Sequence, residues 1–242
     1  MKIYVVGIGP GDSEQMTRRA ANVLDSCEVL VGYHVYVDLI KSEYPDKEYL
    51  TTPMKKESER CRAALDLAVE GKNVAMICSG DAGVYGMAGL MLEMSQEFED
   101  IEVEVIPGVT AANSGGAVLG APLGHDFVVI SLSDLLTPWR LIEERLEYAA
   151  MGDFAICLYN PASIKRADYL QKACDVLLRH KSGDTVCGIV RNIGRDGESM
   201  KLLSLGKLRD TAVDMFTTVY VGNAQTKEIG GRMVTPRGYK NV

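Results

Sequence analysis

The 242-residue sequence predicts an α/β protein with two α/β domains, the first built on a mainly parallel sheet and the second on a mixed sheet. Three observations predict this fold. Short apolar runs typical of strands alternate with segments of helical periodicity, glycine-rich turns directly follow three of the runs, and the alternation restarts near residue 120. Alternating strands and helices favour a parallel sheet. We place the domains at 1–120 and 121–242 and expect a ligand cleft between them.

In the first domain, Asp12 is expected to cap a helix, with Gln15 completing a capping box. A second helix is expected to end at Gly71, a residue suited to a helix C-terminus. The expected strands are 3–8, 28–31, 48–51, 74–78 and 103–106, and the expected helical segments are 16–27, 61–68 and 86–94.

The second domain restarts with a strand. Thr137 is expected to cap the next helix, with Pro138 at its first position. The expected strands are 127–132, 154–158, 185–190, 201–204 and 217–221, with a helical stripe over 167–178. The long uncharged stretch 105–124 contains prolines and several glycines, so it predicts a buried turn and helix rather than a membrane span.

Composition and charge argue against several classes of partner and site. The net charge is −7 and no Lys/Arg-rich run occurs, so we expect no nucleic-acid partner. The N-terminus runs straight into a glycine turn and is no signal peptide, which predicts a cytoplasmic protein without a membrane partner. The six cysteines are scattered without a C-x-x-C pair, which favours buried reduced thiols over a metal site or disulfides; they are Cys27, Cys61, Cys78, Cys157, Cys174 and Cys187.

The glycine-rich turns lie at 6–12, 79–86 and 107–112, each at the end of an expected strand. Open α/β sheets bind their ligands at such strand ends. A dinucleotide fingerprint would need glycine at position 12, where Asp12 stands. A carboxylate about 4 Å from a phosphate would cost about 4 kcal/mol at an effective dielectric near 20. A helix terminus offers an anion only about 0.3–1 kcal/mol. The turns therefore predict a ligand without phosphate.

Asp81, flanked by glycines, suits a ligand that is cationic or rich in hydroxyl and amino donors. S-adenosylmethionine has these properties, since it carries a sulfonium, an ammonium and ribose hydroxyls. The alternative for Asp12 and Asp81 is simple helix capping. We favour capping for Asp12 and the ligand role for Asp81.

Together these motifs resemble the tetrapyrrole (corrin/porphyrin) methylase family. The signatures are V-G-x-G-P-G-D at 6–12, S-G-D-x-x-x-Y-G at 79–86 and P-G-V-T-A-A at 107–112. The chain is most similar to the branch that methylates carbon 17 of the macrocycle. That similarity is carried by residues 31–40, 119–127, 130–139, 158–161, 188–192, 217–223 and 231–239.

The resemblance implies two α/β domains, S-adenosylmethionine as methyl donor, a tetrapyrrole substrate and a homodimer. It implies methylation of carbon 17 of precorrin-3B or cobalt-factor III in cobalamin biosynthesis. Ring contraction by extrusion of carbon 20 would accompany it, giving precorrin-4 or cobalt-precorrin-4. No protein-bound metal is expected, and any cobalt would be carried by the substrate. The alternatives are methylation at another carbon and non-catalytic binding of the cofactor or the tetrapyrrole.

Transferred position by position, the family's cofactor contacts fall on Pro10, Ser79, Gly80, Asp81, Val84, Thr110, Ala111, Tyr159, Asn160 and Asn192. The chain departs from the family at Ala82, where proline is usual, and at His34, where lysine is expected. Ring contraction needs proton transfer near neutral pH, which makes His34 the first catalytic candidate. Lys55 could pair with substrate carboxylates or assist protonation. An exposed turn histidine and a solvated basic loop remain the alternatives.

Overall fold

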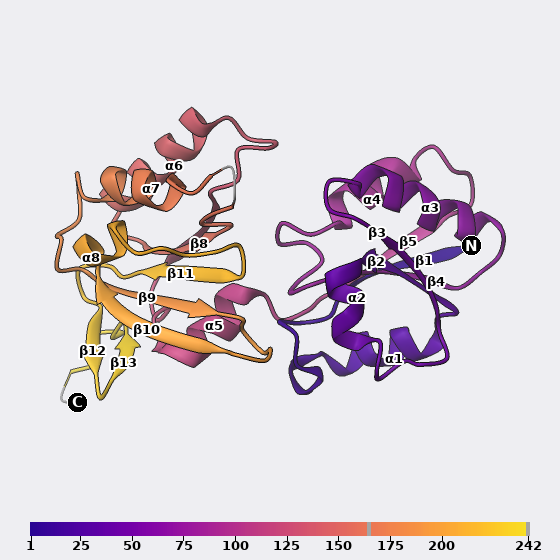
Figure 1. Ribbon diagram of the computed structural model, residues 1–242, viewed down its shortest axis with the longest axis horizontal. Coiled ribbons are helices and arrows are strands. Elements are labelled where there is room, and N and C mark those ends of the chain that lie inside the picture. Colours follow the sequence, from indigo (N-terminus) through magenta and orange to yellow (C-terminus); the bar gives the residue numbers. More distant parts are fainter. Residues whose placement is uncertain (164–165, 241–242) are drawn as a thin grey trace. The chain divides into compact units, whose positions relative to one another are not determined.

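The computed structural model describes residues 1–163 and 166–240, and it divides into two compact units, Met1–Ala111 and Ala112–Val242 (Figure 1). The two units meet at the start of helix α5 (Ala111–Leu119), whereas the boundary expected after residue 120 lies just past the end of this helix. This helix falls with the second unit because its Gly115 packs against Tyr220 and Ile193 there. A Cβ at Gly115 would lie 2.4 Å from the Tyr220 hydroxyl.

The first unit contains a five-stranded parallel sheet in the order β3-β2-β4-β1-β5, as the sequence predicts. All five residues of the central strand β4 are buried, which is typical of a parallel strand covered on both faces. The strands are β1 (Lys2–Gly7), β2 (Val29–Tyr33), β3 (Glu48–Thr52), β4 (Val74–Cys78) and β5 (Glu102–Ile106).

Helices cover both faces of this sheet. They are α1 (Arg18–Ser26), α2 (His34–Ile40), α3 (Glu57–Val69) and α4 (Ala88–Ser95). Met76 of β4 packs in one cluster with α3 and α4, whereas its neighbour Ile77 packs with α1 and α2 on the opposite face. Figure 1 shows these two pairs of helices on the two faces of the sheet. The chain therefore leaves β1 toward one face and the adjacent β4 toward the other. Such a switch in direction is where open α/β sheets bind ligands.

Two local predictions in the first unit are wrong. Asp12 caps only the single 3-10 turn Ser13–Gln15, through the Glu14 N–H. Helix α1 begins later and is capped by Thr17, whose hydroxyl accepts a hydrogen bond from the Ala20 N–H at 3.1 Å. The Asp12–Gln15 capping box is thus absent, because a short turn and a second cap residue separate β1 from α1.

The second unit contains the predicted mixed sheet, in the order β10-β9-β11-β8-β7. Only the β7–β8 pair is parallel among the pairs of this sheet. Helices α6 (Trp139–Met151), α7 (Tyr169–Leu177) and α8 (Leu205–Arg209) pack on one face. Helix α5 lies on the other face, where Leu119 covers Gly188. The strands are β7 (Phe127–Ser131), β8 (Ala155–Tyr159), β9 (Val186–Arg191), β10 (Ser199–Ser204) and β11 (Thr217–Val221).

A small sheet in the second unit lies outside the sequence predictions. It joins β12 (Lys227–Ile229), β13 (Arg232–Val234) and β6 (Gly120–Ala121). The start of α6 also differs from its prediction. Pro138 has ψ 139° and is the N-cap, so the helix begins at Trp139 rather than at the proline.

Two buried features stabilise the units. The buried Lys181 ammonium lies next to the start of β8 and the end of β11, where it donates at 3.1 Å to Asp153 and to the carbonyls of Phe154 and Gly222. All six cysteines are buried free thiols, as predicted. Burial raises the pKa of Cys27 and Cys61 to about 11 and that of Cys78 and Cys174 to about 12, and it also raises the pKa of Cys157 and Cys187. The thiols are therefore protonated at neutral pH.

None of the helices within the described ranges is long and apolar enough to cross a membrane.

Candidate functional site

The three glycine-rich turns meet at the carboxyl edge of the first sheet. Strands β4, β1 and β5 are adjacent, so the loops that follow them are neighbours. The loops after β1 and β4 are joined directly, since Gly9 and Gly80 exchange backbone hydrogen bonds of 3.1 and 2.7 Å. Both glycines have positive φ, 76° and 70°. These three loops carry all the residues of the first unit for which the sequence predicts cofactor contacts: Pro10, Ser79, Gly80, Asp81, Val84, Thr110 and Ala111.

The loop after β5 approaches the other two through its main chain. A Cβ at Gly108 would lie 2.1 Å from the Gly80 carbonyl oxygen and 2.6 Å from that of Gly7. A Cβ at Gly7 would in turn lie 2.7 Å from the Gly108 nitrogen. Side chains are excluded at this junction by steric overlap, so the three turns form one rim of packed backbone.

The Asp81 carboxylate holds this rim together. Its Oδ1 accepts hydrogen bonds from the N–H groups of Gly83 (2.8 Å) and Val84 (3.1 Å), and its Oδ2 accepts from the Gly108 N–H (2.9 Å). In a phosphate-binding loop such N–H groups would point at the ligand. Here the protein's own carboxylate satisfies them, so a phosphate would meet occupied donors and a negative charge.

The two aspartates of the turns therefore differ. Asp12 is exposed and caps the single 3-10 turn Ser13–Gln15 rather than helix α1. Asp81 is only partly exposed and links two loops that are 27 residues apart. An ionised carboxylate offers about four acceptor sites. With three N–H groups bound, Asp81 retains capacity for one more donor, and its ligand role stays a prediction.

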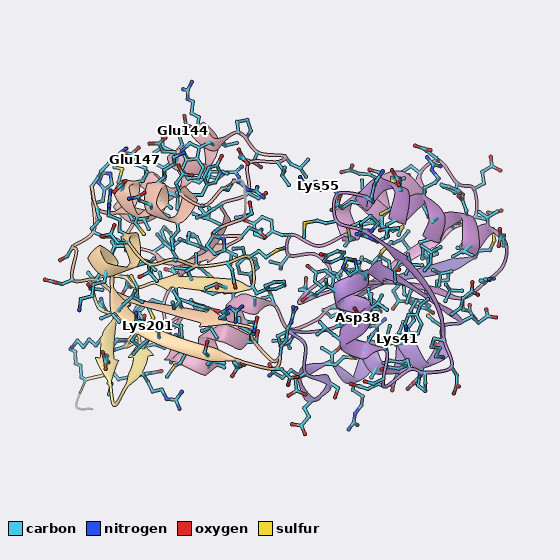
Figure 2. The ribbon with its side chains drawn as sticks, viewed as in Figure 1. Asp38, Lys41, Lys55, Glu144, Glu147 and Lys201 are labelled. Atoms are coloured by element: carbon cyan, nitrogen blue, oxygen red, sulfur yellow. The ribbon has the colours of Figure 1, made fainter. Side chains whose placement is uncertain are left out.

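The catalytic candidates follow the two remaining strands at the same edge. His34 begins helix α2 directly after β2; it is exposed and its ring packs edge-to-face on Tyr33, with the ring centroids 4.5 Å apart. Lys55 lies in the loop between β3 and α3 (Figure 2). It is exposed and has φ 66°, in the left-handed region that non-glycine residues rarely adopt. The parallel sheet thus places both candidates on the edge that carries the glycine turns.

One residue near this loop was missed by the sequence analysis. The Arg60 side chain is 4% exposed and donates from Nε to the Thr52 hydroxyl (2.8 Å) and from Nη2 to the Pro53 carbonyl (3.1 Å). A signal existed, because Arg60 precedes Ala64 by four residues and so lies on the apolar face of α3.

In the second unit, Tyr159 ends β8 and its hydroxyl accepts a hydrogen bond from the Ala112 N–H at 2.6 Å. The Tyr220 hydroxyl donates to the carbonyl of the same alanine at 3.1 Å, so two tyrosines fix the first turn of α5. Asn160 and Asn192 follow β8 and β9 with φ 54° and 53°. Their side-chain amides donate to the Ser131 hydroxyl (2.9 Å) and to the Asp196 carbonyl (3.2 Å).

Asparagine tolerates this left-handed conformation better than most residues, because its short side chain can hydrogen-bond locally. The two asparagines thus form tight turns immediately after β8 and β9, the two strands that flank β11 in the sheet. A role for these turns and for Tyr159 in cofactor binding stays a prediction. Among residues 1–163 and 166–240, no group of three His, Cys, Asp or Glu side chains is arranged to hold a metal ion.

Comparisons with known proteins agree with this geometry. The chain is 50% identical over 238 residues to the "Probable cobalt-factor III C(17)-methyltransferase" of Salmonella typhimurium, covering 98% of this chain and 99% of that protein. It is 43% identical to the "Cobalt-factor III methyltransferase" of Priestia megaterium, of which it spans only 45%. The crystal structure of the methyltransferase CobJ is 34% identical, with a TM-score of 0.90 over 97% of this chain and 99% of that one. Residues 2–209 match the tetrapyrrole (corrin/porphyrin) methylases, and the chain belongs to this family.

Proposed function

We propose that this chain is the S-adenosylmethionine-dependent methyltransferase that methylates carbon 17 of cobalt-factor III or precorrin-3B in cobalamin biosynthesis. The observation that carries the proposal is the 50% identity to the Salmonella C(17)-methyltransferase over nearly the full length of both chains. The relatives at 50% and 43% identity are both named for cobalt-factor III, which favours the cobalt-containing substrate.

The methyl donor is assigned to the rim formed by the three glycine turns. Three backbone N–H groups already donate to Asp81, which disfavours a phosphate and suits a donor whose charge is positive. The remaining acceptor capacity of Asp81 would receive a hydroxyl or amino group of the cofactor. The resemblance assigns the rest of the cofactor contacts, including Tyr159, Asn160 and Asn192.

Methyl transfer needs alignment more than acid or base chemistry. The macrocycle carbon attacks the methyl carbon in line with the sulfur, and the carbon–sulfur electron pair stays on sulfur to give neutral S-adenosylhomocysteine. Holding two reactants in an attack geometry can supply about 7–11 kcal/mol of the barrier reduction. The main-chain contacts among Gly7, Gly80 and Gly108 fit this need, because they leave the rim few ways to move.

The substrate side is assigned to the loops after β2 and β3. The Lys55 ammonium would pair with carboxylates of the macrocycle, and His34 would exchange the protons that ring contraction requires. The protein has a net charge of −7, so an anionic substrate depends on local cations of this kind. The contraction itself, with loss of carbon 20, rests on the family resemblance.

The proposal extends to a cytoplasmic homodimer. Six buried free thiols support a reducing compartment. Leu141, Tyr148 and Met151 lie on one face of α6, and all three are exposed, which supports a partner surface in the second unit. Light scattering of the purified chain measures the oligomeric state directly.

The enzymatic proposal is tested by incubating the purified chain with S-adenosylmethionine and either cobalt-factor III or precorrin-3B. We expect release of S-adenosylhomocysteine and a product one methyl group heavier, with NMR placing the new methyl on carbon 17. A methyl on another carbon would indicate the sibling activity. Binding of cofactor and tetrapyrrole without S-adenosylhomocysteine release would indicate a carrier instead of an enzyme.

A further inference from the structure

Arg60 is a buried cation whose polar contacts are all uncharged. Its guanidinium donates to the Thr52 hydroxyl and the Pro53 carbonyl, and Nη1 lies 3.9 Å from the Met87 sulfur. Arg60 belongs to none of the ion pairs formed within residues 1–163 and 166–240. Burying a charge without an opposite charge is unfavourable. Arg60 therefore carries a desolvation cost that no opposite charge offsets, which points to a role beyond packing.

The contacts of Arg60 converge on the loop that carries Lys55. Thr52 is the last residue of β3 and Pro53 is the first residue of the loop, so two of the donors fix the point where the chain leaves the sheet. Met87 directly precedes α4, at the end of the turn that contains Asp81. Arg60 thus contacts both the loop after β3 and the end of the loop after β4.

The Lys55 backbone is held in a conformation that needs such support. Lys55 has φ 66°, and its N–H donates to the Glu57 carboxylate at 3.2 Å. A non-glycine residue in this region persists only where its surroundings hold it, and such residues cluster at functional sites. Arg60 on one side and Glu57 on the other are the two anchors of this short loop.

We propose that Arg60 is a positioning residue for substrate recognition, which fixes Lys55 and adds positive potential where the carboxylate-rich macrocycle binds. This inference rests on the proposed function, because Lys55 acts there on the substrate. Arg60 itself is too buried to be the main contact. Arg60 therefore acts on the substrate indirectly. Its hydrogen bonds to Thr52 and Pro53 hold the loop that carries Lys55, and its charge adds to the positive potential there.

The test compares Arg60→Met and Arg60→Lys with a matched control, Arg62→Met. Arg62 lies on the same helix but is exposed, where it pairs with Glu97 and stacks on Phe98. We expect Arg60→Met to raise the KM for the tetrapyrrole about tenfold or more through misplacement of Lys55. The Kd for S-adenosylhomocysteine, measured by calorimetry, should stay within about twofold of the wild-type value. Arg60→Lys should recover part of the loss, since it keeps the charge but not the planar fork.

Two further measurements separate positioning from general instability. Hydrogen exchange at residues 54–56 should accelerate in Arg60→Met and not in Arg62→Met. In a double-mutant cycle with Lys55→Gln, the effects on tetrapyrrole KM should be strongly non-additive, because both changes remove the same interaction. If Arg60→Met does not fold, Thr52→Val removes one acceptor while leaving the charge, and the same exchange and KM changes are expected on a smaller scale.

An unchanged tetrapyrrole KM in a folded Arg60 variant overturns the inference. Equal weakening of both ligands or an additive double-mutant cycle also overturns it. If the wild-type chain transfers no methyl group, the proposed function fails, but hydrogen exchange and tetrapyrrole binding followed by absorbance still test the role of Arg60.

Discussion

Replacing Asp81 by asparagine tests whether this carboxylate is both the link between the loops and part of the cofactor site. The amide oxygen of asparagine can still accept from Gly83 and Val84, but its NH2 group would face the Gly108 N–H, donor against donor. A lost hydrogen bond to a charged group costs about 1.5–3 kcal/mol. For a chain of this size each kcal/mol shifts Tm by about 2–4 °C, so we expect Tm to fall by about 3–12 °C.

Calorimetry then distinguishes the two roles of Asp81. If the carboxylate also attracts the sulfonium, Asp81→Asn should weaken S-adenosylmethionine more than the neutral S-adenosylhomocysteine. If it acts through the loops, or through a hydroxyl or amino group that both ligands carry, both ligands should weaken equally. Asp12→Asn is the control, because Asp12 is exposed and accepts one hydrogen bond, from Glu14. Unchanged Tm together with unchanged affinity for both ligands in Asp81→Asn would refute the reasoning.

Three further predictions follow from packing and charge. Gly108→Ala should abolish S-adenosylhomocysteine binding in calorimetry because its Cβ would overlap the Gly80 carbonyl, whereas Gly89→Ala, with open space around it, should bind normally; equal binding by both variants would contradict the close approach. Lys181→Met should lower the free energy of unfolding in urea by about 1–3 kcal/mol, because buried carbonyls lose their donor, and a neutral result would show that water replaces it. A hydrogen bond from Tyr169, supported by Arg166, lowers the pKa of Asp134 below 3.8; this stabilisation is present above that pH and is lost as the pH falls through the folded-state pKa. The Tm difference between wild type and Tyr169→Phe should therefore be largest near neutral pH and shrink in acid, and a difference that grows in acid would reverse the assignment.

The strands of the two five-stranded sheets were predictable from sequence to within about two residues, most clearly where an apolar run is bounded by glycine or charge. β4 was predicted at 74–78 and occurs there. Helix α2 (His34–Ile40) was not predicted. β12 and β13 were also missed. All three residues of β12 are exposed, so no alternation of apolar and polar residues marks that strand.

The site was predictable where it depends on topology and not where it depends on side-chain contacts. A βαβ rhythm implies parallel strands, which places all three turns at one edge of the sheet, whereas the order β4-β1-β5 that makes them neighbours is known only from the structure. The hydrogen bond from the Gly108 N–H to the Asp81 carboxylate joins residues 27 positions apart. It depends on how two loops pack together, and no local sequence pattern encodes that packing. Arg60 is similar, because an arginine on an apolar helix face is ambiguous until its partners are known.

The crowded junction of Gly7, Gly80 and Gly108 also limits how this enzyme can diverge. With no space for a Cβ at Gly7 or Gly108, substitution cannot reshape this part of the rim, to which the methyl donor is assigned in the proposed function. On the proposed function, a change in which ring atom is methylated would have to come from exposed side chains such as His34 and Lys55. Proteins with this fold would therefore keep the same methyl donor while the substrate that receives the methyl group changes.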